Sequence, residues 1–349
     1  MKYSKKVRLL IVGSSQGFYG GIEAFMIAIA QAASGWPELE VCLGFKMVKG
    51  TKPKLELNKM ADKSCKNIRY LKRCSIDLFK LIDWADVIHV QNMPPDIVIP
   101  AFLKQKKIFL TVHNRKINGF GLHNLIWSIT IKLAKERWFN SKYVWNTWEP
   151  SRKGIRSKCI PTICNLPTNE FPIEKRKGFV FVGRWIKNKG IEEILMAYAR
   201  ANFDKIENPL TIIGDGPLRN EVIKLIAELD IKVSLPGFVS DSEKYHIIAS
   251  SKWLLAPANT KEDLGLTPIE ARNVGVPSIV SMDGGLPESG GPSALLVKPG
   301  DIEDLKNCLQ IAASMDKIKY KEISFLAKES LNEFLIDINF YKESFLNKA

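Results

Sequence analysis

The sequence predicts an α/β protein of two domains, each built on a parallel β-sheet. Its 349 residues are more than one hydrophobic core usually serves, and 46% of them are hydrophobic, so two cores can form. Short apolar runs alternate with helical periodicity along the chain. Such alternation favours parallel sheets with right-handed crossovers. A segment with two prolines and five charged residues, 167–177, divides two halves that repeat the pattern.

In the first half, apolar runs predict strands at 7–12, 87–90, 108–112 and 143–145. Apolar residues recur with helical spacing after Gly21 and again over 120–139.

The second half repeats this arrangement. Strands are predicted at 178–182, 210–213, 253–255 and 278–280, and helices at 191–199 and 218–229. From Tyr320 onward the chain has a helical pattern. We therefore divide the sequence into a Rossmann-like domain over 1–168, a second over 169–325, and a C-terminal helical segment, 326–349, that can pack back on the first domain.

Positive charge is concentrated in the first half. Residues 1–165 hold 28 Lys and Arg against 11 Asp and Glu, an excess of 17, whereas the rest of the chain holds 23 against 26. The asymmetry indicates an anionic partner for the first domain, such as nucleic acid, a phosphorylated substrate or a membrane. The helical pattern at 120–139 fits a core-facing helix or, with Lys132, Lys135 and Arg137 near its end, a membrane-docking one.

The rest of the composition predicts a cytoplasmic protein. The six cysteines form no C-x-x-C pair, and with only four histidines they offer no zinc-binding spacing. We expect reduced thiols. No apolar run reaches the length of about 18 residues that a membrane-spanning helix needs. The apolar run before Gly13 is too short for a secretion signal.

The most informative segment carries two carboxylates, Glu262 and Glu270, across a loop that enters a helix. Thr267 is a suitable N-cap and Pro268 a suitable first helical residue, which would make Glu270 a capping-box residue and Glu262 a solvated loop charge. The alternative is a ligand site, because backbone amides at a helix N-terminus can bind a diphosphate without a metal.

Two cations follow the first strand of the second half. Gly183 ends that strand, and Arg184 and Lys189 precede the next helix. A guanidinium can bind two phosphate oxygens and an ammonium supplies a compact charge, so the pair could hold phosphates. A basic surface turn would have the same pattern.

Glycine-containing loops follow other predicted strands at 20–21 and 214–217, and a further glycine loop lies at 237–239, about 20 residues on. Glycine lets a ligand approach the backbone closely, although each loop alone is only a turn signal. The glycines of the first half do not match G-x-G-x-x-G, which argues against a dehydrogenase. His113 ends a strand, at the edge where open α/β sheets bind ligands, although a lone histidine is more often structural.

Together these segments resemble glycosyltransferase family 4, a large group of retaining enzymes. The resemblance covers residues 7–299, and its most specific part runs from Glu262 to Glu270 and on to Pro277. It implies the GT-B fold, with two Rossmann-like domains whose parallel sheets face each other across a cleft, and a C-terminal helical tail. The first domain would bind the acceptor and the second the nucleotide-sugar donor.

The resemblance also implies a role for each matching residue. Arg184 and Lys189 would bind the donor diphosphate, Glu270 the ribose, and Glu262 the donor sugar, beside which His113 would lie. The expected catalytic residues are His113, Glu262, Arg184 and Lys189. The expected donor-binding residues are Gly20, Gly21, Gly183, Arg184, Lys189, Gly214, Gly237, Phe238, Val239, Glu262, Leu264, Gly265, Leu266 and Glu270.

The implied activity is transfer of a sugar, with retention of configuration, from a UDP- or GDP-sugar to a saccharide or lipid-linked saccharide. Cations and helix-terminal amides would stabilise the departing nucleoside diphosphate, so we expect no metal and no other cofactor. The basic first domain would suit synthesis of bacterial cell-envelope polysaccharide (lipopolysaccharide, O-antigen or capsule). The enzyme would be cytoplasmic or peripheral on the inner face of the cytoplasmic membrane.

Other interpretations stay open. A sugar-nucleotide epimerase or a phosphorylase could use a similar scaffold, although a phosphorylase would want a pyridoxal-type lysine and usually a longer chain. A nucleic-acid-binding protein would explain the charge, but no recognition motif occurs, so we expect no nucleic-acid partner. The sequence departs from the family at 160–166, where a Pro-Asn-Gly turn is absent, and at Trp185, which is often aliphatic there.

Overall fold

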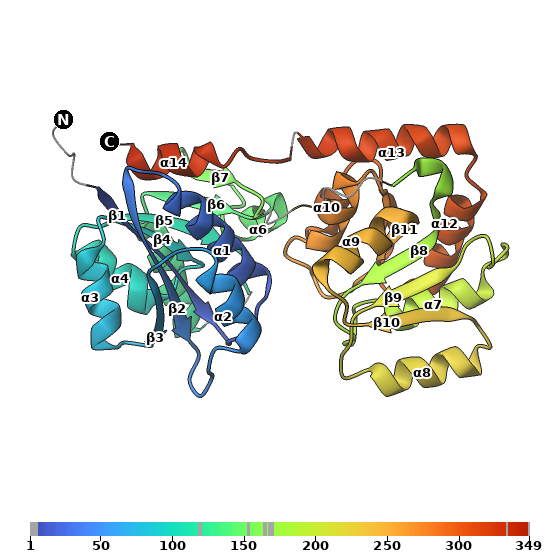
Figure 1. Ribbon diagram of the computed structural model, residues 1–349, viewed down its shortest axis with the longest axis horizontal. Helices are drawn as coiled ribbons and strands as arrows, with labels where there is room; N and C mark the ends of the chain where they lie inside the picture. Colours follow the sequence, from blue (N-terminus) through green and yellow to red (C-terminus); the bar gives the residue numbers. More distant parts are fainter. Residues whose placement is uncertain are drawn as a thin grey trace. The chain divides into compact units, whose positions relative to one another are not determined.

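The chain forms two compact units in the computed structural model (Figure 1). The structure describes residues 6–117, 121–151, 154–162, 166, 171–332 and 334–347. One unit comprises Met1–Asn165 with Ile336–Ala349, and the other Leu166–Leu335. The segment predicted over 326–349 is therefore divided, because its first part completes a helix of the second unit and its last part returns to the first.

The described residues of the first unit form a seven-stranded sheet in which every strand pair is parallel. Its order is β3-β2-β1-β4-β5-β6-β7, so the direction of winding reverses between β1 and β4. The strands are β1 (Val7–Ser15), β2 (Leu39–Met47), β3 (Ile68–Lys72), β4 (Val87–Gln91), β5 (Lys107–Val112), β6 (Glu136–Phe139) and β7 (Ser157–Cys159).

Helices cover both faces of this sheet, because successive strand residues point to opposite sides and both sides are apolar. Leu9 and Ile11 pack with one layer of helices, whereas Leu10 and Val12 pack with the other. The first layer contains α1 (Gly21–Ser34), α2 (Leu55–Asp62) and α14 (Asn339–Leu346). The second contains α3 (Ile76–Trp84), α4 (Pro95–Leu103), α5 (Leu122–Thr130), the 3-10 turn η1 (Ile131–Leu133) and α6 (Lys142–Trp148).

The second unit repeats the design. Its described residues form a parallel six-stranded sheet in the order β10-β9-β8-β11-β12-β13, with the reversal between β8 and β11. The strands are β8 (Lys177–Val182), β9 (Leu210–Ile213), β10 (Val233–Gly237), β11 (Ser251–Ala256), β12 (Ser278–Ser281) and β13 (Leu295–Val297). The helical elements are η2 (Ile173–Lys175), α7 (Ile191–Arg200), α8 (Arg219–Glu228), α9 (Asp241–Ser250), α10 (Leu266–Asn273), α11 (Leu286–Gly290), α12 (Ile302–Ser314) and α13 (Lys317–Asn332).

Two sequence predictions in the first half are wrong. Residues 143–145 lie in α6 rather than in a strand, because Ser141 Oγ accepts a hydrogen bond from Val144 N (3.0 Å) and starts the helix. The helix expected over 120–139 ends early, and Trp138 belongs to β6. Trp138 and Phe139 point to opposite layers, and both are fully buried. A strand buried on both faces shows no alternation, so its apolar run resembled the end of a helix.

Within the described parts of the chain, no helix combines the length and apolar character needed to cross a membrane. The C-terminal helix α14 instead packs into the first core through Tyr341 and Phe345, which contact the ring of Trp138. Figure 1 shows α14 lying along β5, β6 and β7.

Candidate functional site

The strand order of the second unit reverses between β8 and β11. In open α/β sheets, ligands bind in the crevice outside the carboxyl ends of the strands at such a reversal. The loop after β8 carries Arg184 and Lys189, and the loop after β11 carries Glu262. The structure therefore brings together the two charged segments that the sequence singled out.

Glu262 lies in a network of hydrogen bonds. Lys189 Nζ donates to Glu262 Oε1 in an ion pair, and Thr260 Oγ1 donates to the same oxygen over 2.6 Å. Burial raises the pKa of Glu262, but Lys189, Thr260 and Arg184 outweigh it and hold that pKa below its ordinary value. Glu262 is thus a carboxylate at neutral pH, and it is a largely buried partner of Lys189 rather than a solvated loop charge.

Asp283, which follows β12, holds the Glu262 segment in place. Its Oδ2 accepts hydrogen bonds from the backbone N of Thr260 (2.9 Å) and of Lys261 (2.5 Å). Gly285 N donates to Glu262 O over 2.7 Å. Sequence reasoning missed Asp283 and Thr260. The signal available for Asp283 was its place between a predicted strand and the Gly-Gly pair at 284–285.

Helix α10 begins earlier than the sequence suggested. Its N-cap is Gly265 (φ 87°), not Thr267, and no side chain caps it. A Cβ on Gly265 would lie 2.7 Å from Leu286 Cδ2, so this position needs glycine for both its conformation and its packing. Glu270 is the fifth residue of the helix, too far along to cap it. The capping-box interpretation is wrong, and the first amides of α10 remain available to an anion.

Glu270 forms a second ion pair, with Lys244 of α9, over 3.0 Å. Both side chains are largely buried, at 14% and 17% exposure. Burial raises the pKa of Glu270, and Lys244 offsets part of that rise. Among the described residues nothing donates to the buried Glu270 Oε2. Because a buried acceptor without a partner costs about 1–3 kcal/mol, a ligand hydroxyl at this oxygen would be favourable.

Three of the expected glycines of the second unit, Gly183, Gly214 and Gly237, meet at the carboxyl ends of β8, β9 and β10. Gly183 N donates to Ile213 O (3.1 Å), and Gly214 N donates to Gly237 O (2.8 Å). Gly214 has φ 122°, and a Cβ there would lie 1.9 Å from Gly183 O. Glycine is therefore required where these two loops touch. Phe238 follows with 81% exposure.

The remaining expected residues of this unit are apolar and contact the fold in different places. Val239 packs against the core formed by α9 and α10. Leu264 is buried, and Leu266 is the first residue of α10. The backbone amides of 264–266 thus surround the start of the helix, while the two leucines fix the loop.

The first unit has its own reversal, between β1 and β4, and the residues that the sequence singled out there, Gly20, Gly21 and His113, are neutral. Gly20 is the N-cap of α1 and Gly21 its first residue. The glycine with a left-handed backbone in this loop is instead Gly17 (φ 87°). His113 follows β5, and its ring packs edge-on against Phe25 of α1, with 5.8 Å between ring centroids. The structure therefore places His113 beside the helix that the glycines begin.

His113 is held by two neighbours. Its Nε2 shares a hydrogen bond with Gln91 Oε1 (2.8 Å), and its backbone N donates to Asn92 Oδ1 (2.9 Å). Because Gln91 Oε1 only accepts, Nε2 carries the hydrogen, and this leaves Nδ1 without one. Burial lowers the pKa of His113 to about 3, so the ring is neutral at physiological pH. Gln91 was not foreseen.

Among the described residues, no three His, Cys, Asp or Glu side chains come together as metal ligands. The charged groups of the second unit are instead organised around Lys189 and Lys244, each paired with one glutamate.

Comparison with known families shows what the second unit is similar to. The family described as "Glycosyl transferases group 1" matches residues 167–324. The match runs from the start of the second unit into α13 and includes both glutamates and both cations.

Two characterised relatives are similar over part of the chain. N-acetyl-alpha-D-glucosaminyl L-malate synthase of Bacillus anthracis is 25% identical over 162 residues, which are 46% of this chain and 42% of that protein. A GDP-mannose-dependent monoacylated alpha-(1-6)-phosphatidylinositol monomannoside mannosyltransferase of Corynebacterium glutamicum is 26% identical over 133 residues, which are 36% of this chain and 35% of that protein. The chain thus matches less than half the length of either relative.

A solved structure is similar over almost the whole chain. The Anabaena protein HepE in complex with UDP has a TM-score of 0.77 at 16% identity, covering 97% of this chain and 98% of that one. At this identity the similarity shows the fold. The chain has the GT-B fold that the family resemblance implied, with two units that each contain a parallel Rossmann-like sheet.

Proposed function

We propose that this protein is a retaining glycosyltransferase that uses a nucleotide-sugar donor. The observation that carries the proposal is the arrangement at the β8/β11 reversal of the second unit. There Lys189 pairs with Glu262, Arg184 lies close enough to influence its pKa, and an uncapped helix begins at Leu266. Cations and amides placed together suit a departing diphosphate.

In this proposal each charged residue has one task. Arg184, Lys189 and the first amides of α10 stabilise the charge that grows on the diphosphate as the glycosidic bond breaks. Glu262, held as a carboxylate, accepts hydrogen bonds from hydroxyls of the donor sugar. Glu270 accepts from the ribose through its unpaired Oε2. Departing phosphate can take the acceptor's proton on the same face, so retention needs no carboxylate nucleophile.

The loops around this network would hold the rest of the nucleotide. Gly183, Gly214 and Gly237 form a backbone surface that can approach a base closely, and the exposed ring of Phe238 can stack on it. The relative that uses GDP-mannose and the structure that holds UDP leave both bases as candidates.

The first unit would receive the acceptor and contribute the neutral His113 with Gly20 and Gly21. We propose a saccharide or a lipid-linked saccharide as acceptor, in the synthesis of cell-envelope polysaccharide at the inner face of the cytoplasmic membrane. Two features support this. The unit's excess of 17 positive charges suits an anionic surface, and the Corynebacterium relative acts on a phosphatidylinositol mannoside.

Purified protein should be screened with UDP- and GDP-sugars for binding by calorimetry and for transfer to saccharide and lipid-linked acceptors. We expect one nucleotide-sugar to bind, transfer to continue in excess EDTA, and the product linkage to keep the donor's anomeric configuration by NMR. Loss of activity in EDTA that Mg²⁺ or Mn²⁺ restores would overturn the metal-independent mechanism. Conversion of the donor without any acceptor would indicate an epimerase instead.

A further inference from the structure

Helices α4 and α5 pack side by side in the same layer and turn apolar side chains outward. Each helix has one side toward the sheet and one away from it, and in α4 the inward residues are Ile97, Val98 and Ala101. The exposed residues recur every three to four positions on both helices. This outer apolar face consists of Ile99, Phe102 and Leu103 on α4 and Leu122, Leu125 and Ile129 on α5.

The side chains of this face stand largely in solvent, since Leu103 is 74% exposed and Leu122 is 73% exposed. They differ from exposed apolar residues elsewhere, such as Ile206, in that they recur on two helices that pack together. Contiguous exposed apolar surface on a soluble domain commonly marks an interaction site, because burying each such side chain would gain about 1.5–3 kcal/mol. The helical pattern that could have faced the core or a membrane thus presents these positions outward.

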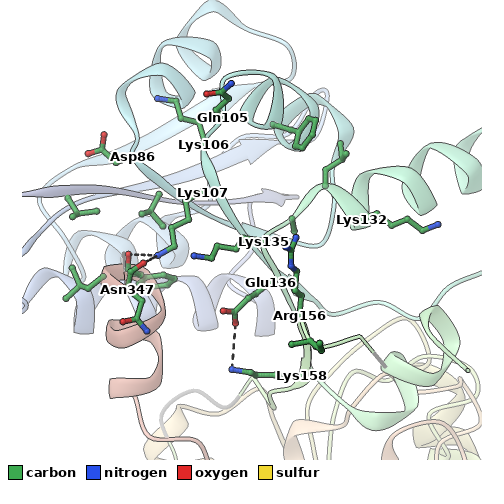
Figure 2. A pocket seen from close by; sticks show the side chains of 18 of the residues that line it. Asp86, Gln105, Lys106, Lys107, Lys132, Lys135, Glu136, Arg156, Lys158 and Asn347 are labelled. Carbon is green, nitrogen blue, oxygen red and sulfur yellow. Dashed lines mark hydrogen bonds and ion pairs between the residues drawn. The ribbon is translucent and has the colours of Figure 1, made fainter. Parts of the chain in front are cut away.

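A basic pocket adjoins this face at the amino edge of the sheet. It has a volume of about 1120 Å³ and lies where β1, β4, β5 and β6 begin. Phe102 and Leu103 of the outer apolar face line it, together with Leu133. Figure 2 shows the cations among its lining side chains. They are Lys106, Lys107, Lys132, Lys135, Arg156 and Lys158.

The acidic residues of the pocket are already engaged. Asp86 accepts two hydrogen bonds from the guanidinium of Arg8, over 2.7 and 3.0 Å. Glu136 accepts from Trp138 Nε1 (3.0 Å) and lies 3.8 Å from Lys158 Nζ. Asp86 is therefore paired with Arg8, and Glu136 faces six lining cations, so the pocket keeps an excess of positive charge.

Several cations of the pocket lack a counter-charge. In the described part of the chain, the side chains of Lys132, Lys135 and Arg156 make no hydrogen bond or ion pair. The Lys107 ammonium donates to carbonyl oxygens at the end of α14 and lies over the ring of Phe109. Burial is the main cause that lowers the pKa of Lys107 to about 8, Lys135 adds to the fall, and Glu136 opposes it. Cations gathered without a counter-charge favour an anion in the pocket.

We propose that the outer apolar face and the basic pocket dock this protein on a bilayer containing anionic phospholipid. The apolar side chains would enter the interfacial region, and the pocket would take a headgroup phosphate. A second copy of the chain is the weaker candidate, because two such surfaces would bring their unneutralised cations together. This inference rests on the proposed function, because docking would serve to bring the protein to a lipid-linked acceptor.

The orientation follows from the topology. Helix α5 begins after the carboxyl end of β5 and ends before the amino end of β6, so it runs alongside the strands. With the outer apolar face on the membrane, the strands of the first unit lie along the membrane plane. The carboxyl edge with His113 then opens sideways, within reach of a headgroup-linked saccharide.

Vesicle co-sedimentation tests the basic pocket. Protein should bind phosphatidylcholine vesicles that contain phosphatidylglycerol, bind pure phosphatidylcholine weakly, and dissociate as salt rises. The triple variant Lys132→Gln, Lys135→Gln, Arg156→Gln should bind anionic vesicles about 100-fold more weakly, since each cation near an anionic surface is worth tenfold or less. The control removes the same charge from the opposite layer, with Lys59→Gln, Lys63→Gln and Lys66→Gln, and should lose far less. If both triple variants lost the same vesicle affinity, binding would reflect only non-specific attraction of positive charge, and the pocket would not be the phosphate site.

A second comparison tests the outer apolar face. Leu122→Ser, Leu125→Ser and Ile129→Ser together should weaken vesicle binding at least tenfold while keeping the melting temperature. The matched control changes exposed apolar residues of the second unit, Ile206→Ser, Ile318→Ser and Phe325→Ser, and should keep binding. Saturable binding of glycerol phosphate without vesicle binding would assign the pocket to a soluble phosphate. A dimer in sedimentation that the Leu122 triple variant dissociates would assign the face to a second copy.

Sugar transfer to a soluble acceptor separates this proposal from the proposed function. Both triple variants should keep it, because their residues lie away from the β8/β11 reversal. Transfer without vesicle binding would overturn docking alone, and vesicle binding without transfer would overturn the proposed function alone.

Discussion

The two sheets share one strand order but differ in what stands at their reversal points. At the β8/β11 reversal, Lys189 pairs with Glu262, and Lys244 pairs with Glu270 nearby. At the β1/β4 reversal lie glycines, side-chain amides and a histidine that burial keeps neutral. The charges near it, Lys46 of β2 and Asp96 of α4, form a buried ion pair with each other (2.7 Å). The excess charge of the more basic unit therefore does not come from its reversal point, and part of it lies in the basic pocket at the opposite edge of its sheet.

The comparison teaches that net charge and site chemistry are separate properties. A domain's net charge decides which surfaces attract it, whereas the groups at a strand end decide which charges it can stabilise. The nearly neutral unit is the one suited to a diphosphate.

The largest expected contrast between the units is in acid. Burial, and for His89 also the neighbouring His113, lowers the pKa of both histidines from 6.5 to about 3. The unfolded state binds these protons first, so the first unit should lose stability as pH falls from 6.5 toward 4.5, before ordinary glutamates titrate. As pH falls, hydrogen exchange should show the first unit unfolding at a higher pH than the second. His89→Gln should reduce this difference in unfolding pH, and the exposed control His246→Gln should not. Unfolding of both units at the same pH would contradict the prediction.

A smaller effect is expected on catalysis at the charged reversal. Arg184→Ala should lower kcat/KM by roughly 30- to 1000-fold, about 2–4 kcal/mol, if its guanidinium stabilises charge that develops on the leaving group. Lys189→Ala should cost a similar amount and also release Glu262. Lys187→Ala removes an exposed cation from the same loop and serves as the control. Equal activity of the Arg184 and Lys187 variants would make this a basic surface turn.

Glu270 should contribute mainly to donor affinity. Glu270→Gln should weaken binding of the nucleotide by about 10-fold or more, the range for losing a hydrogen bond to a charged group. Glu262→Gln should instead lower turnover. Calorimetry on Glu270→Gln and on the exposed control Glu221→Gln would measure the first effect. A variant that is less stable but binds the nucleotide normally would leave Glu270 a structural role only.

The smallest effect concerns how helix α14 is held on the first unit. Lys107 Nζ donates to the backbone oxygens of Ser344, Phe345 and Asn347 (2.9, 3.2 and 2.6 Å). Lys107→Ala should destabilise this unit by about 1 kcal/mol, because a cation that satisfies terminal carbonyls stabilises a helix end. Faster amide exchange confined to α14 is the expected readout. The exposed control Lys80→Ala should leave amide exchange in α14 unchanged. Unchanged exchange in the Lys107 variant would show that Lys107 does not cap α14.

Much of the fold was predictable because its central strands are strongly apolar. Strands β1, β4, β5, β8, β9, β11 and β12 coincide with predicted runs. Others were missed, since β2 contains Glu40, Gly44 and Lys46, and β7 and β13 are only three residues long. Local patterns carry little signal in such segments, whose pairing is decided by neighbours distant in the sequence.

The sequence by itself determined the α/β architecture, the charge asymmetry and the identity of the charged residues, because apolar periodicity and composition are local properties. Only the tertiary structure decided how those residues are used. It placed Glu262 beside Lys189, 73 positions away, and Glu270 beside Lys244 instead of at a helix cap. It also turned the apolar stripe of α5 outward. Contacts between distant segments depend on how the strands are ordered in the sheet, and a linear pattern does not contain that order.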